Sequence, residues 1–409
     1  MLSRTLSRRH LLKLGAGLAV AGVLGCEEEQ ATTPTPAPRG AAPAPSGPPV
    51  KVGVLVPTSD VYTALGRDML NGYNLYFQQV NFTAGGRRIE LITEDETGDA
   101  NVALTRARKL IEADRVEVFT GVVSTAAVYA MRDLLHQSRT LSIITNAGGN
   151  DLTRGRKSPY IFRASFTSWQ VSFPLGKWVA DNLTKRVAIM YADYGFGQES
   201  RAAFKESFTA AGGQVLDEIA FPLGNSDFSS VIDRIRAARP DAVYGFAAGS
   251  DAVLFLRQFA QAGLRGRIPL AVTGFMVEQE VLQSVGRDAL DTYSSLHWSV
   301  TLDNPTNRRF VDEYRRRYNE LPSVYSVQAY DGARVIVEVL NAVNGDTSDP
   351  DRLVRAAEAV RFDSPRGLFE FDPVTHNVIQ NVYLRQVREQ GGQIVNVVVS
   401  DLGRVRDPG

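Results

Sequence analysis

The segment VAIMYADYGFGQESRAAFKESFTAAGGQVLDEIAF at residues 187–221 decides the fold class. Its apolar residues predict a strand over 187–191, an amphipathic pattern predicts a helix over 197–211, and a second apolar run predicts a strand over 214–221. Two strands separated by one helix of this length are typical of a βαβ unit, in which the strands are parallel.

The same alternation continues on both sides of this segment. Upstream, expected strands over 51–56, 88–93, 116–120 and 141–145 alternate with expected helices over 66–80, 101–113 and 124–137. Downstream come a helix over 228–237, a strand over 242–246, a helix over 252–262 and a strand over 268–272. Two such series predict an α/β protein with two doubly wound parallel-sheet lobes. The C-terminal part is less regular, with helices expected over 304–318, 324–343 and 350–360 and strands over 368–371 and 382–387.

The first 25 residues have the three parts of a bacterial export signal. A basic segment with Arg8 and Arg9 resembles the twin-arginine motif, with Leu11 where that motif usually has Phe. The apolar run over 14–25 is shorter than the roughly 20 residues that a membrane span needs. The residues before Cys26 resemble a lipobox, so we expect cleavage at this point and lipidation of Cys26. Export through the Sec pathway, and an amphipathic helix with an incidental cysteine, are the alternatives.

A tether is expected between this signal and the body of the protein. Residues 26–49 are rich in Ala, Thr, Gly and Ser and contain seven prolines from Pro34 to Pro49. Such a composition cannot bury a core and favours an extended, disordered segment.

Composition argues against several functional classes. Lys+Arg and Asp+Glu balance at 45 each, and loss of the leader, with four basic residues and no acid, leaves a small acidic excess. This net charge lacks the excess of basic residues that is typical of nucleic-acid-binding proteins. Cys26 is the only cysteine, and beyond the leader the only histidines are His136, His297 and His376, so neither a disulfide within the chain nor a zinc site is expected. We expect no cofactor and no catalytic residue, because the common nucleotide, hydrolase and metalloprotease motifs are absent.

An ordered set of motifs over about 50–399 resembles the branched-chain amino-acid-binding (LIV-type) periplasmic proteins of ABC importers. The set comprises Val52–Thr58, Gly121–Thr125, Leu152-Thr153 before Tyr160–Arg163, Ala192–Gly197, Asp227–Ser229, Pro240–Val243 and Tyr330–Gly332. The resemblance implies a type I periplasmic-binding fold with three crossovers, near Ser165, Trp298 and Phe371. It places the N-terminal lobe at 50–165 plus 298–368 and the C-terminal lobe at 166–297 plus 369–402.

The function implied is capture of a small molecule outside the cell. The resemblance implies a monomeric solute-binding lipoprotein, anchored through Cys26 in the periplasm or at the cell surface, that delivers its ligand to ABC permease and ATPase subunits. A ligand-sensing ectodomain of the same fold, signalling to a membrane partner, is the alternative, and an α/β enzyme is a third. Ligand is expected between the lobes, at the carboxyl ends of the strands.

Two turns of the first lobe are candidates for holding the polar head of the ligand. Ser124 and Thr125 follow a strand and open a helix, where hydroxyls and free N–H groups suit a carboxylate. Asn146, Ala147 and Gly148 follow the next strand, and the resemblance assigns Asn146 and Gly148 to ligand contact. An ordinary helix cap and an ordinary turn are the alternative interpretations.

The second lobe supplies candidates for covering the ligand, and three departures from the family pattern. The candidates are Tyr194, Ala248, Gly249, Thr273 and Phe275. Ala248 stands where the family has a covering aromatic residue, Gly148 where it has a threonine, and Thr273-Gly274-Phe275 contains no acid to neutralise an ammonium group. Packing of Tyr194 beneath its own loop is the alternative for that residue.

These departures favour an aromatic carboxylate over an α-amino acid. A buried ammonium group without a partner costs several kcal/mol, roughly, so an amino acid fits only if Glu278 or Glu280 reaches the ligand. We expect Phe275, Trp169, Tyr62 and Leu65 to line the pocket, with ordinary packing as the alternative for each.

Overall fold

The computed structural model describes residues 45–409. Arg8, Arg9, Cys26 and most of the expected tether lie outside the described residues. Within 45–409, no helix combines the length and apolarity that crossing a membrane requires.

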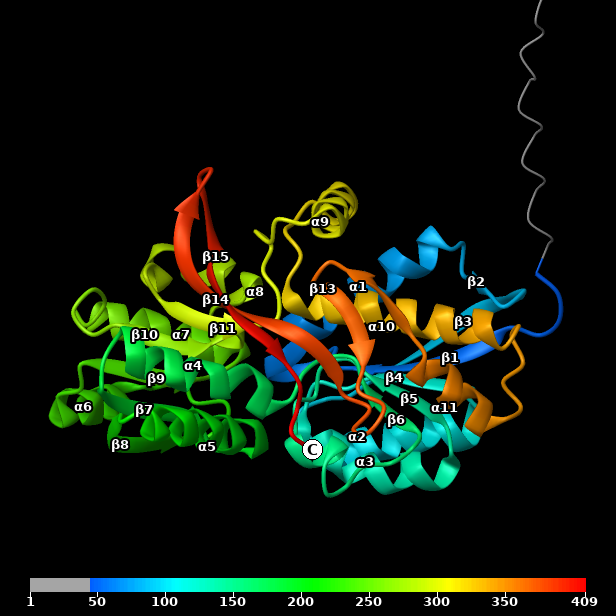
Figure 1. Ribbon diagram of the computed structural model, residues 1–409, viewed down its shortest axis with the longest axis horizontal. Coiled ribbons are helices and arrows are strands. Elements are labelled where there is room, and N and C mark those ends of the chain that lie inside the picture. Colours follow the sequence, from blue (N-terminus) through cyan, green and yellow to red (C-terminus); the bar gives the residue numbers. More distant parts are fainter. Residues whose placement is uncertain (1–44) are drawn as a thin grey trace, which may run out of the picture. The chain divides into compact units, whose positions relative to one another are not determined.

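The first sheet carries the N-terminal βαβ series (Figure 1). Its strand order is β2-β3-β1-β4-β5-β6, and every pair except β2–β3 is parallel. The strands are β1 (Val50–Val56), β2 (Thr83–Ala84), β3 (Arg87–Asp95), β4 (Val118–Gly121), β5 (Leu141–Ile144) and β6 (Ile161–Arg163).

Helices cover both faces of this sheet because its central strand is apolar on both sides. Val52 and Val54 of β1 pack in the core shared with α1 (Thr63–Gln79) and α10 (Val324–Ala342). Leu55, on the opposite face, packs with residues of α2 (Ala100–Arg108) and α3 (Thr125–Ser138). A parallel strand buried on both faces has the continuous hydrophobic run seen here.

The second sheet has the order β12-β13-β14-β11-β10-β9-β7-β8, with β15 paired to β14. The run from β8 to β11 is parallel, and the pairs made by β12–β15 are antiparallel. The strands are β7 (Arg186–Ala192), β8 (Gln214–Phe221), β9 (Ala242–Phe246), β10 (Leu270–Thr273), β11 (Tyr293–Leu296), β12 (Arg361–Ser364), β13 (Gly367–Phe371), β14 (Val378–Gln390) and β15 (Gln393–Val405).

Four helices cover the parallel part of this sheet. Val187 and Ile189 pack with α4 (Ser168–Asn182) and α5 (Gly195–Ala210), while Met190 and Val243 face the core shared with α6 (Ser229–Ala238) and α7 (Gly249–Gln261). The remaining α-helices are α8 (Gln279–Val285), α9 (Pro305–Tyr318) and α11 (Pro350–Glu358). Short turns of helix are η1 (Asp60–Tyr62), η2 (Lys109–Ala113), η3 (Asn150–Thr153), η4 (Gly274–Val277) and η5 (Gly286–Ala289).

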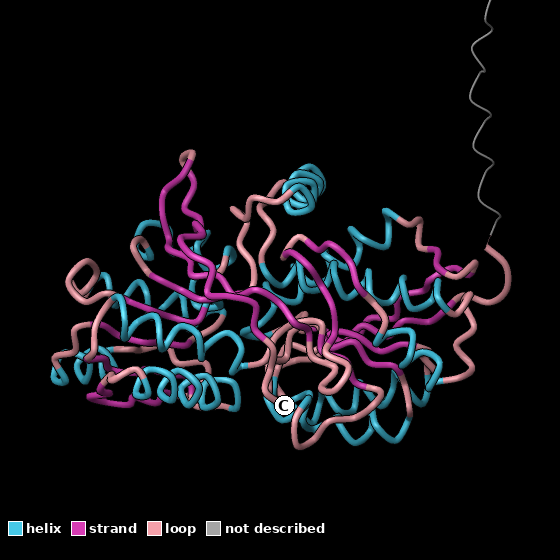
Figure 2. The backbone as a smooth tube through the Cα atoms, in the orientation of Figure 1, coloured by secondary structure: helices cyan, strands magenta, loops and turns pink. Residues whose placement is uncertain are grey.

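The chain connects the two sheets three times. It leaves the first sheet after β6, and it returns after β11 to reach α10, which packs beside α1 (Figure 2). The last connection runs along β14, where Val378 pairs with Phe371 of β13 and Tyr383 pairs with Leu296 of β11.

The predicted fold class is confirmed, and most predicted elements begin and end within a few residues of the observed ones. Helix α4 was not predicted, although Thr167 and Gln170 form a capping box at its start. Pro174 interrupts the helical pattern of that segment, so the sequence pattern did not indicate a helix there. Strands β2, β6, β11, β12 and β15 and helix α8 were also not predicted.

Candidate ligand-binding site

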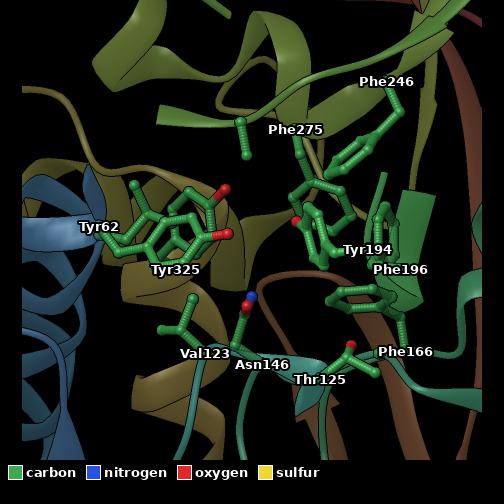
Figure 3. A pocket seen from close by; sticks show the side chains of 13 residues that line it. Tyr62, Val123, Thr125, Asn146, Phe166, Tyr194, Phe196, Phe246, Phe275 and Tyr325 are labelled. Atoms are coloured by element: carbon green, nitrogen blue, oxygen red, sulfur yellow. The ribbon is translucent and has the colours of Figure 1, made fainter. Parts of the chain in front are cut away.

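A cavity lies between the two sheets, where the carboxyl ends of their parallel strands face each other (Figure 3). It contains about 350 Å³ of space between atoms, part of which is open to solvent. The thirteen lining residues come from turns and helix starts of both lobes: Tyr62, Leu65, Val123, Thr125, Asn146, Gly148, Phe166, Tyr194, Phe196, Phe246, Ala248, Phe275 and Tyr325.

Aromatic rings form most of the cavity wall. Seven of the lining residues are Phe or Tyr, and their rings contact one another as well as the empty space. The ring centroids of Phe166 and Phe275 are 4.6 Å apart, and those of Phe196 and Phe246 are 4.4 Å apart. Such contacts hold the rings in place before a ligand arrives, which favours a flat apolar guest.

The polar character of the cavity comes from helix starts and hydroxyl groups. Thr125 is the first residue of α3, and Tyr194 and Ala248 directly precede α5 and α7 without capping them through their side chains. Helix starts carry unpaired N–H groups and a partial positive charge. Among residues 45–409, no charged side chain lines the cavity, so the helix starts supply partial positive charge at its surface.

Part of the α3 start is already occupied by a buried carboxyl group. Glu96 accepts hydrogen bonds from the backbone N–H groups of Val123 and Ser124, each at 2.7 Å. Burial raises the pKa of Glu96 to about 8, and the two N–H groups oppose this rise. The Ser124 hydroxyl accepts from the N–H of Ala127 and so caps the helix. Thr125 is therefore the polar residue of this turn that lines the cavity, beside the apolar Val123.

The next turn is held by hydrogen bonds on both of its sides. Asn146 is joined to Gln328 at 2.7 Å, and its backbone carbonyl accepts from the Ser165 hydroxyl at 3.0 Å. A Cβ atom on Gly148 would lie 2.4 Å from the Phe166 ring. A glycine at this position is therefore what allows Phe166 to reach the cavity wall.

The structure brings eight of the predicted ligand residues to the cavity: Tyr62, Leu65, Thr125, Asn146, Gly148, Tyr194, Ala248 and Phe275. Burial raises the pKa of Tyr62 to about 12 and that of Tyr194 well above its usual range, so both hydroxyls stay protonated.

Five predicted residues lie elsewhere. Ser124 is the helix cap, Ala147 is buried behind the turn with its N–H bonded to Val122, and Thr273 is buried away from the cavity. The Trp169 ring stacks on Phe173 at 4.5 Å, because the start of α4 directs it outward. Gly249 lines a neighbouring groove beside Val61.

Five lining residues were not predicted: Val123, Phe166, Phe196, Phe246 and Tyr325. Phe196 and Phe246 supply aromatic surface in the second lobe, where Ala248 departs from the covering aromatic residue of the family pattern. Both had a detectable signal, since Phe246 ends a predicted strand and Phe196 lies in the motif beside Tyr194. Tyr325 comes from α10, far away in the sequence, and no local pattern indicated it.

Neither acidic candidate lines the cavity. The Glu278 carboxylate pairs with Arg385 at 2.9 Å, and both side chains are buried. Both carboxyl oxygens of Glu280 are buried with no hydrogen-bond partner among residues 45–409. Burial raises the pKa of Glu280 well above its usual range, and the nearby Glu278 and Asp68 raise it further.

The two lobes also meet beside the cavity through Glu199 of α5. Its carboxylate accepts from the Tyr129 hydroxyl of α3 at 2.9 Å and from the N–H of Asn150 at 2.8 Å. We refer to Tyr129, Asn150 and Glu199 as the lobe latch.

The chain matches the periplasmic binding protein family over residues 49–393 and belongs to that family. It is 32% identical over 367 residues to the Leu/Ile/Val-binding protein homolog 6 of Brucella suis, an alignment that covers 88% of this chain and 93% of the relative. The predicted resemblance to LIV-type binding proteins and the type I periplasmic-binding fold are thereby confirmed.

Solved structures of ABC-transporter solute-binding proteins share this fold. One from Rhodopseudomonas palustris BisB5, in complex with 3,4-dihydroxybenzoic acid, is 34% identical with a TM-score of 0.84, and the match covers 88% of this chain and 98% of the other. One from R. palustris in complex with benzoate is 31% identical with a TM-score of 0.84 and the same coverage of both chains. These relatives are binding proteins and not enzymes.

Proposed function

We propose that this protein is the extracytoplasmic solute-binding component of an ABC importer and that it captures a small aromatic carboxylate of the benzoate and hydroxybenzoate type. The observation that carries the proposal is the cavity itself, which has seven aromatic rings and, among the described residues, no charged side chain.

Among the described residues no carboxylate lines the cavity, and this favours an aromatic acid over an amino acid as the ligand. Glu278 is neutralised by Arg385, and Glu280 does not reach the cavity, so an α-ammonium group would be buried without a counter-charge. A benzoate has no ammonium group, and the start of α3 at Thr125 offers N–H and hydroxyl donors for its carboxylate. The ligands of the two R. palustris proteins agree with this choice.

Capture then follows from closure of the lobes over the ligand. We propose that the lobes, 50–165 with 298–368 and 166–297 with 369–402, rotate about the three connections and that ligand favours the closed form because only that form contacts it from both sides. The monomeric, closed protein delivers its ligand to permease and ATPase subunits. Twin-arginine export and lipidation at Cys26 would hold it at the membrane.

A thermal-shift screen tests the proposed ligand class. Benzoate, 4-hydroxybenzoate and 3,4-dihydroxybenzoate should raise the melting temperature, since a ligand at a hundredfold excess over Kd stabilises a protein by about 2.7 kcal/mol. Leucine and isoleucine should have little effect, and a response to leucine without a response to the aromatic acids would contradict the proposal.

Two sets of variants test its parts separately. The double substitution Ser124→Ala and Thr125→Ala should weaken carboxylate binding, and an unchanged Kd would move the anion site away from α3. Cys26→Ser should release the protein from the membrane fraction, and continued membrane attachment would contradict lipid anchoring while leaving the ligand class untouched.

A further inference from the structure

Three buried side chains connect the cavity to the segment that links the lobes after β11. Asn146 lines the cavity and is 5% exposed, while Gln328 and His297 are fully buried behind it. The Asn146 amide donates from Nδ2 to Oε1 of Gln328 at 2.7 Å, and Nε2 of Gln328 is 3.0 Å from Nε2 of His297. The Phe166 ring stacks on the His297 ring at 5.6 Å, so His297 lies directly behind the cavity wall. We call these residues the amide relay.

The imidazole at the end of the relay is neutral. Burial lowers the pKa of His297 well below its usual range, and the positive charges of Arg366 and Arg385 lower it further. A neutral imidazole has one N–H group and one bare nitrogen, and each can serve one hydrogen bond. Nδ1 of His297 is buried and has no hydrogen-bond partner among residues 45–409.

The relay has two self-consistent arrangements, because the oxygen and nitrogen of an amide are interchangeable in shape. In the first, which has the amide atoms where the structure places them, bare Nε2 accepts from Gln328, Gln328 accepts from Asn146, and the Asn146 oxygen faces the cavity. The second exchanges the oxygen and nitrogen of both amides. In the second, Nε2–H donates to Gln328, Gln328 donates to Asn146, and the Asn146 NH₂ group faces the cavity. The position of one proton on His297 therefore decides which polar group the cavity presents.

The unpartnered Nδ1 atom distinguishes the two arrangements. The first leaves a buried N–H donor without an acceptor, whereas the second leaves only a bare nitrogen. Orphaned buried N–H groups are the rarer and more costly of the two defects in folded proteins. We infer that His297 is protonated on Nε2 and that, through Gln328, it turns the Asn146 amide so that its NH₂ group faces the cavity as a hydrogen-bond donor.

This orientation makes the relay a determinant of ligand specificity. An NH₂ group of Asn146 that faces the cavity donates to a carboxylate or phenolate oxygen of the ligand and disfavours a ligand group that must itself donate. The assignment of that ligand group to an aromatic acid rests on the proposed function. His297 and Gln328 do not touch the cavity and act only by positioning Asn146.

Nitrogen NMR of the full chain labelled with ¹⁵N-histidine tests the proton position without any ligand. The His297 signals are assigned by substituting His10, His136 and His376 one at a time. We expect a protonated Nε2 and a bare Nδ1, and the opposite pattern overturns the relay. Because this readout needs no ligand, it tests the relay even if no aromatic acid binds. A failure to bind aromatic acids would contradict the proposed function but not the relay.

A variant then tests the effect on binding. Gln328→Met keeps the size of the side chain but removes both relay bonds, so the Asn146 amide is free to rotate and the Kd for 4-hydroxybenzoate should rise about tenfold, while that for 4-hydroxybenzamide changes less. The matched control is Gln279→Met on α8, which removes another buried glutamine outside the cavity and should leave both Kd values unchanged. An unchanged Kd in the folded Gln328→Met variant overturns the relay, and should this variant not fold, the NMR result decides alone.

Discussion

Arg385 donates from Nη1 to Oε2 of Glu278 at 2.9 Å, and this ion pair is buried directly behind η4, which carries Phe275 of the cavity wall. Arg385 also donates to the backbone carbonyl groups of Trp298 and Gly274. The pair thus links β14 to the turn before Phe275 and to the segment that leaves the second sheet.

Glu278→Gln should destabilise the protein strongly, because it leaves the buried Arg385 guanidinium without its counter-charge. Loss of one partner of a buried pair typically costs about 3–5 kcal/mol. Urea denaturation would measure the change in the free energy of unfolding. The control is Glu389→Gln, which breaks a largely exposed pair with Arg287 and should cost less than about 1 kcal/mol; equal losses in the two variants would contradict this account.

Glu280 should make stability depend on pH. Its pKa in the folded protein is raised above the ordinary value of 4.5, first by burial, so the folded state holds a proton that the unfolded chain releases. Below pH 4.5 Glu280 is protonated in both the folded and the unfolded state, so it does not reduce the free energy of unfolding. That free energy falls as the pH rises toward the pKa of Glu280 in the folded protein. Glu280→Gln should therefore raise the melting temperature at pH 8 and change it little at pH 4.5. A variant that is less stable at both pH values would show that the carboxylate has a partner in solution.

Phe275→Leu should weaken binding of aromatic acids while keeping an apolar side chain at the same place. The Phe275 ring contacts Phe166 and Phe196 and faces the cavity, and an aromatic pair contributes about 0.5–1.5 kcal/mol beyond its buried area. Isothermal titration should give a Kd about 2–10 times higher. Phe369→Leu removes a buried ring outside the cavity and serves as the control, so a similar loss of affinity there would point to a general effect of destabilisation.

Glu199→Ala should remove the lobe latch and shorten the lifetime of the closed complex. Hydrogen bonds to a charged group contribute about 1.5–3 kcal/mol, and these two join different lobes, so the proposed opening of the lobes would break them. Stopped-flow measurements should show ligand dissociation at least about tenfold faster, with a smaller change in association. Glu206→Ala, an exposed residue on the same helix, should leave both rates unchanged. Unchanged dissociation in Glu199→Ala would mean that the latch contributes nothing to holding the lobes together.

Local patterns were sufficient to predict the alternating strands and helices of both lobes and two polar residues that line the cavity, Thr125 and Asn146. A parallel strand buried on both faces has a continuous apolar run, and Thr125 and Asn146 directly follow two such strands. Their place at the strand ends puts them in the cleft whatever the rest of the chain does.

What could not be predicted depends on contacts between distant segments. Tyr325 and Gln328 reach the site only because α10 returns to the first sheet after the whole second lobe. Trp169 has the residue type of a cavity wall, but the turn of α4 on which it lies directs it toward Phe173. The neutralisation of Glu278 depends on Arg385, more than 100 positions away in the sequence.

Gly249 begins α7 with a positive φ of 56°, and a Cβ atom there would lie 2.6 Å from the backbone carbonyl oxygen of Val61 in the facing lobe. At this point the backbones of the two lobes lie directly against each other, with no side chain between them. A single methyl group added at Gly249 would therefore leave each lobe folded but prevent the two lobes from approaching this closely. A variant held in the open form would show whether an ABC importer recognises the closed conformation of its binding protein or the bound ligand.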